Sequence, residues 1–134
     1  LIENRSLYTN ANTAYSLYCS PIEYALFLEE MLRLDRSAPQ SLSAASIDSM
    51  LRRTTEAAGR KPIHRKGQPP AETTYYGLGW AIDPAAAGDR IFHSGSNRGF
   101  RCYCEFDPRR GSGIVIMTNG EGGAELWQEL IGAL

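Results

Sequence analysis

The feature that most constrains the fold is an alternating run of apolar residues, followed by a turn and a second apolar run. Apolar side chains occupy every second position from Phe100 to Phe106, and Asp, Pro and Gly follow within residues 107–111. Residues 113–119 then contain four consecutive apolar side chains. Alternation indicates a strand with one buried face, whereas a continuous run indicates a strand covered on both faces. The pattern predicts an antiparallel hairpin between two layers.

Two further strands are expected upstream of this hairpin. A period of two begins at Tyr75 and places four large apolar side chains on one face of a strand. Turn residues within residues 83–89 then lead into a short strand over residues 90–94. The sheet is therefore expected to be antiparallel with three to four strands. The side chains assigned to the buried face of the first strand are Tyr76, Leu78, Trp80 and Ile82.

Three segments have the period of helices. Ser20 can cap a helix in which Pro21 takes the first position and Glu23 completes a capping box, and we expect this helix to end within residues 34–36. A second helix is expected after Ser43. The last segment of the chain has an apolar face that can pack on the sheet. The members of that face are Leu126, Trp127, Leu130 and Ile131.

These elements predict an α+β fold over residues 1–134, with helices before the sheet and one helix after it. Residues 1–51 are expected to be helical and residues 75–134 to form the sheet and the terminal helix. Residues 52–74 are rich in basic side chains and prolines and have no period, so they are expected to form a flexible basic loop.

Charge and composition exclude several classes of partner and site. The net charge is −1, from 14 basic and 15 acidic residues, so neither nucleic acid nor an anionic membrane is expected as a partner. No apolar stretch approaches the ~20 residues that cross a bilayer. Three cysteines do not form a disulfide framework, and with two histidines at unsuitable spacing no metal site and no cofactor are expected. The sequence itself fixes no cellular compartment.

The segment whose residue types best suit a catalytic or binding site is residues 93–101, where polar side chains and glycines follow a strand. Imidazole, hydroxyl and exposed backbone N–H groups together can orient an acyl substrate and stabilise an oxyanion. A polar hairpin edge with a hydrogen-bonded histidine is an equally good interpretation of these residues alone.

The order of several motifs resembles the family of class C β-lactamases, D-alanyl carboxypeptidases and esterases. The resemblance covers nearly the whole chain and implies an incomplete β-lactamase/transpeptidase-like fold, the C-terminal portion of a serine hydrolase. It is compatible with a periplasmic or extracellular location. The motifs are Ser16-Leu17-Tyr18-Cys19-Ser20, Tyr76-Gly77-Leu78-Gly79-Trp80, His93-Ser94-Gly95-Ser96-Asn97, Gly99-Phe100-Arg101 and Thr118-Asn119-Gly120.

The resemblance implies roles for the residues of the third active-site motif, where penicillin-recognising members carry Lys-Thr-Gly. His93 and Ser94 would hydrogen-bond the substrate and assist proton transfer, and Gly95 would keep the strand edge open. The backbone N–H of Ser96 would form half of the oxyanion hole. The following residues, Asn97, Arg98 and Gly99, are expected to contact the substrate.

The expected substrate is a small acyl compound: an ester, a D-amino-acid peptide or a β-lactam. Histidine titrates near pH 6.5 whereas lysine remains a cation at neutral pH. A carboxylate-bearing β-lactam would therefore be held less firmly by His93 than by lysine, which favours ester or peptide-amide hydrolysis.

The chain contains no Ser-x-x-Lys, the motif in which the lysine activates the family's nucleophile. The family's second motif is usually Tyr-x-Asn. Tyr8-Thr9-Asn10 matches these letters, but it lies only a few residues before Ser16, whereas the family places a long helical region between the two segments. This chain alone is therefore expected to be inactive, with the N-terminal remainder of the same protein or another copy of the chain as its partner. The alternatives are a non-catalytic β-lactamase-like binding or scaffold module, and an unrelated α+β interaction domain.

Overall fold

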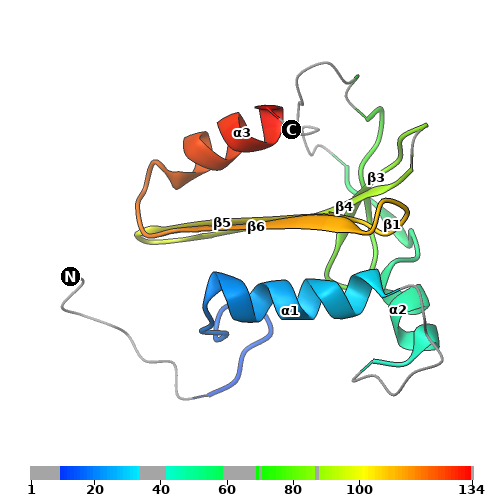
Figure 1. Cartoon of the computed structure of the whole chain (residues 1–134), viewed down its shortest axis with the longest axis horizontal. Helices are drawn as coiled ribbons and strands as arrows, with labels where there is room; N and C mark the ends of the chain where they lie inside the picture. Colours follow the sequence, from blue (N-terminus) through cyan, green and yellow to red (C-terminus); the bar gives the residue numbers. More distant parts are fainter. Residues whose placement is uncertain (1–9, 34–41, 59–68, 70, 87, 134) are drawn as a thin grey trace.

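The computed structural model describes residues 10–33, 42–58, 69, 71–86 and 88–133. Six strands form one antiparallel sheet in the order β1-β2-β3-β4-β5-β6, and three helices flank it (Figure 1). The α+β prediction is therefore confirmed. The elements are α1 (Pro21–Leu32), α2 (Ala44–Met50), β1 (Thr55–Glu56), β2 (Tyr75–Tyr76), β3 (Ala81–Asp83), β4 (Arg90–Asn97), β5 (Phe100–Asp107), β6 (Ser112–Thr118) and α3 (Gly123–Ala133).

Helix α1 begins where the sequence predicts. The side chain of Ser20 accepts a hydrogen bond from the backbone N–H of Glu23, whose carboxylate accepts one from the N–H of Ser20. This reciprocal pair is a capping box. At α2 the side chain of Ser43 forms a simple cap by accepting the N–H of Ser46. Helix α1 ends at Leu32, slightly before the predicted end.

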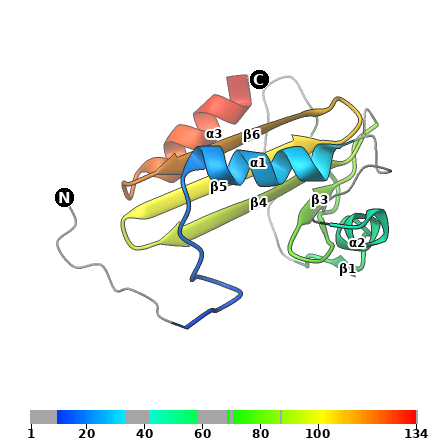
Figure 2. The ribbon, with the colours of Figure 1, turned by 60° about the horizontal axis from the view of Figure 1, so that its bottom comes forward.

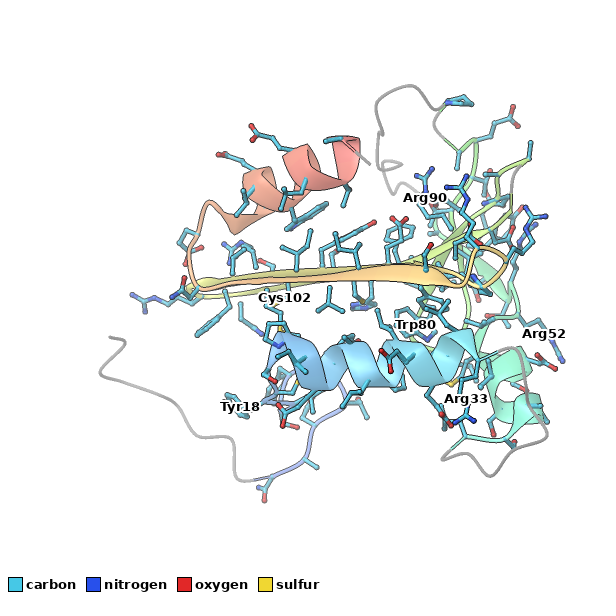
Figure 3. The ribbon with its side chains drawn as sticks, in the orientation of Figure 1. Tyr18, Arg33, Arg52, Trp80, Arg90 and Cys102 are labelled. Carbon is cyan, nitrogen blue, oxygen red and sulfur yellow. The ribbon has the colours of Figure 1, made fainter. Side chains whose placement is uncertain are left out.

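The sheet lies between two helical layers, so helices cover part of each of its faces (Figure 1). Helix α1 covers one face, where Leu28 and Met31 join a core with Trp80 and Phe106. Figure 3 shows Trp80 between the sheet and this helix. Because strands alternate their side chains between faces, a second core forms on the opposite face under α3.

The second core confirms that the C-terminal helix packs on the sheet. Trp127 of α3 stacks on Tyr103 of β5, with ring centroids 4.5 Å apart and planes inclined by 10°. Ile131 is fully buried beside them. The predicted apolar face is only half correct, because Leu126 and Leu130 remain 49% and 45% exposed.

The predicted strand count of three to four is wrong, since the sheet has six strands. One of the additional strands, β1, lies inside the segment expected to be a loop and pairs with β2. A strand of two residues is too short to show an alternation in the sequence. Such a strand forms only because it pairs with a segment that is distant in sequence. Residues 59–68 of that predicted loop lie outside the described residues.

The single strand expected from Tyr75 to Ile82 is in fact two strands joined by a tight turn. Tyr76 pairs with Ala81, and the N–H of Gly77 donates to the carbonyl of Trp80 at 2.8 Å. Gly79 adopts a φ of 80°, which glycine tolerates without strain. Leu78 at this turn is 58% exposed, so its assignment to the buried face is wrong.

Candidate active site

The predicted site residues lie on β4 and on the turn that follows it. Strand β3 pairs only with the first three residues of β4, ending with the pair Ala81 and Phe92. Strand β5 pairs along β4 from Ile91 to Asn97. In the part of the chain that the structure describes, β4 therefore has an open edge from His93 onward. An open edge exposes backbone N–H and C=O groups that can bind an extended ligand.

The turn of Arg98 and Gly99 determines which backbone groups face the open edge. In a two-residue hairpin the flanking pair, here Asn97 and Phe100, is hydrogen-bonded, and hydrogen-bonded pairs then alternate with non-hydrogen-bonded ones. Ser96 and Ser94 fall in non-hydrogen-bonded pairs with β5. Their backbone N–H and C=O groups therefore point away from β5, toward the open edge.

Side chains of the motif alternate between the two faces of the sheet. His93 is exposed and shares the α1 face with its pairing partner Cys104, whereas Ser94 is half-buried and shares the α3 face with Tyr103. The imidazole is not enclosed in either core. Ser96 is exposed opposite Arg101 on the α3 face.

Gly95 lies between these residues, opposite Cys102. A Cβ at this position would meet only the Cβ of Cys102, at 3.9 Å, which is an ordinary contact. Packing within the described residues therefore does not require glycine here. A ligand on the strand edge would benefit from the space that a side chain would occupy.

The face of the sheet beneath His93 and Gly95 carries a group of cysteines beside Tyr24 of α1. The thiol of Cys104 lies 3.7 Å from the carbonyl oxygen of His93 and 3.9 Å from the phenolic oxygen of Tyr24. Burial raises the pKa of the Cys104 thiol to about 11 and also raises the pKa of Tyr24. Figure 3 shows Cys102 on this side of the sheet, near the start of α1. Cys104 and Tyr24 therefore stay neutral at physiological pH, and they pack against the α1 face of the sheet behind the motif.

The end of β4 and the turn after it carry the last three predicted site residues, Asn97, Arg98 and Gly99. Asn97 and Arg98 are exposed, and Gly99 has a φ of 75° that suits the tight turn. The N–H of Gly99 donates to the carboxylate of Glu121 at 2.6 Å, and the guanidinium of Arg101 binds the same carboxylate. Sequence reasoning did not predict Glu121, because a glutamate within a glycine-rich turn has no local signature.

Neither a metal centre nor a membrane segment emerges from the described residues. No group of three or more His, Cys, Asp or Glu side chains among them could hold a metal ion. In the same residues, no helix combines the length and apolar character needed to span a bilayer.

Comparison with known proteins identifies the family. A family model described as Beta-lactamase matches residues 5–133. Comparison with curated proteins and with solved structures gave no match in either case. The family match spans almost the whole sequence and includes the β4 motif, the hairpin and both flanking helices. The chain therefore belongs to the beta-lactamase family.

Proposed function

We propose that this chain forms one wall of a serine hydrolase site that acts through an acyl-enzyme, and that another stretch of polypeptide supplies the reactive serine. The observation that carries the proposal is the open edge of β4, onto which the N–H of Ser96 points. A backbone N–H directed at a developing oxyanion stabilises it in the transition state. Family membership supports the same assignment.

Each residue of the motif has a role in this proposal. The N–H of Ser96 is one donor of the oxyanion hole, and the N–H of the nucleophile is the other. The exposed imidazole of His93 and the hydroxyl of Ser94 each hydrogen-bond the substrate and assist proton transfer. Asn97, Arg98 and Gly99 contact the part of the acyl substrate that extends beyond the reacting carbonyl.

The preferred substrates in this proposal are esters or peptide amides. A carboxylate-bearing β-lactam would be held less firmly by histidine than by lysine, because histidine is the weaker cation at neutral pH. Turnover of β-lactams much faster than of simple esters would contradict this preference. The proposal for the acyl-enzyme itself would survive that result.

Labelling with a fluorophosphonate tests whether the reactive serine lies elsewhere. We expect the isolated chain to remain unlabelled, since none of its serines has a lysine three positions later. A longer protein that contains this segment should be labelled at a serine outside residues 1–134, with the site read by peptide mass spectrometry. Labelling of Ser94, Ser96 or any other serine of the isolated chain would overturn the proposal. If the longer protein is not labelled but binds acyl compounds, the chain belongs to a non-catalytic module.

A further inference from the structure

A single carboxylate ties the β4–β5 turn to the segment between β6 and α3. Glu121 accepts the N–H of Gly99 through Oε1, and its Oε2 accepts a hydrogen bond from the guanidinium of Arg101. These partners lie 22 and 20 residues away in sequence. The contact therefore joins two connections at the same end of the sheet, which local structure alone would leave independent.

Arg101 extends this connection across the turn. Its guanidinium donates to the carbonyl oxygens of Asn97 and Phe100, the two residues that flank the turn. The carbonyl oxygen of Arg101 in turn accepts the hydroxyl of Thr118 at 2.8 Å. Arg101 also lies directly opposite Ser96 in the register of β4 and β5. The network therefore reaches the neighbour of the residue whose N–H faces the open edge.

The base of α3 is packed tightly against the same residues. A Cβ at Gly123 would lie 1.7 Å from Oγ1 of Thr118 and 3.0 Å from the Cβ of Arg101. This close approach holds the segment that carries Glu121 directly beside the hairpin. The carboxylate of Glu121 therefore lies between the tightly packed start of α3 and the β4–β5 turn.

The carboxylate of Glu121 is stabilised in its charged form by its partners in this network. The hydrogen bond from Gly99 lowers the pKa of Glu121, with Arg101 and Arg98 acting in the same direction. The side chain of Glu121 is 61% exposed. An ion pair this exposed contributes little to the stability of the whole fold, so its effect falls on the local geometry of the turn.

We infer that Glu121 is a positioning residue for the candidate active site. Through Gly99 and Arg101 it fixes the hairpin tip, and thereby the direction of the N–H of Ser96. This inference rests on the proposed function. A donor that is displaced from the oxyanion weakens binding of the transition state more than binding of the substrate.

Glu121→Gln, made in the longer protein that carries both this segment and the reactive serine, tests the inference. Glutamine keeps an acceptor for Gly99 but presents no charge to Arg101. We expect kcat for a p-nitrophenyl ester to fall by about tenfold to a hundredfold, with KM nearly unchanged. Glu129→Gln removes an equal charge from the exposed surface of α3 and is expected to leave kcat unchanged. Arg101→Gln combined with Glu121→Gln should lower kcat no further than the more impaired single variant, because both belong to one network.

Amide exchange provides a readout that does not need catalysis. Exchange at Gly99 should be faster in Glu121→Gln than in wild type, while the unfolding temperature stays the same. Unchanged exchange, or an unchanged kcat in an active protein, would overturn the positioning role alone. A wild-type protein that neither hydrolyses the ester nor reacts with a fluorophosphonate would overturn the proposed function and this inference with it.

Discussion

At the scale of single residues, Cys104 differs from the other two cysteines in its burial. It is 5% exposed beneath α1, whereas Cys19 and Cys102 are half-buried. The thiolate is the form that reacts with alkylating agents. With a pKa of about 11, Cys104 is almost entirely protonated at neutral pH, and its thiolate fraction rises tenfold per pH unit until that value. We expect iodoacetamide at pH 7.5 to modify Cys104 last, and faster as the pH increases, as measured by peptide mass spectrometry.

Urea provides the control for this reactivity order. In the unfolded chain all three thiols should react at comparable rates, because burial no longer distinguishes them. Rapid alkylation of Cys104 in the folded protein at pH 7.5 would show that α1 does not cover β5.

Residues with local signatures were predictable, and residues that act over long separations were not. The capping box of Ser20 and Glu23 and the cap at Ser43 depend on neighbours within one helical turn, and both predictions are confirmed. The motif on β4 was found through family resemblance, and its roles remain predictions. Glu121 was missed because its partners become neighbours only when the sheet forms.

At the scale of elements, the turn into α3 depends on Gly123. An added Cβ would overlap Oγ1 of Thr118 and force that side chain away from the carbonyl of Arg101. We expect Gly123→Ala to lower the free energy of unfolding by about 1–3 kcal/mol, measured by urea denaturation. Gly122→Ala is the matched control, because a Cβ there meets nothing within 4 Å. Its effect should stay within about 0.5 kcal/mol, and equal effects of both variants would refute the packing argument.

The strands β5 and β6 were predicted more accurately than the shorter ones, whereas β4 continues to Asn97, three residues beyond its predicted end. β5 and β6 have long apolar patterns separated by turn residues, and they form the predicted hairpin with Asp107 opposite Ser112. β2 and β3 together resemble one alternating strand, since the sequence does not reveal that the chain reverses at Gly79. Tyr103 occupies a position expected on the less apolar face of β5, yet it is buried because α3 covers that face.

At the scale of the whole molecule, the order of helical and alternating periods predicted the fold class. Helices α1 and α3 lie on opposite faces of the sheet, with α1 in front and α3 behind in Figure 2. This assignment came only from the structure, because both helices present apolar side chains that suit either face. The sheet ends at β6, which pairs with β5 and with no further strand of the described residues.

The free edge of β6 leads us to expect that the isolated chain self-associates or binds a partner that extends the sheet. Residues 114–118 are half-buried, so the edge combines unpaired backbone groups with apolar side chains. Sedimentation velocity should show species larger than the monomer that dissociate on dilution. Met117→Lys places a charge on this edge and should shift the chain toward monomer, whereas Leu130→Lys places one on the exposed surface of α3 and should not. If only Leu130→Lys produces monomers, the contact surface is α3. A wild-type chain that remains monomeric at high concentration would show that the edge needs no partner.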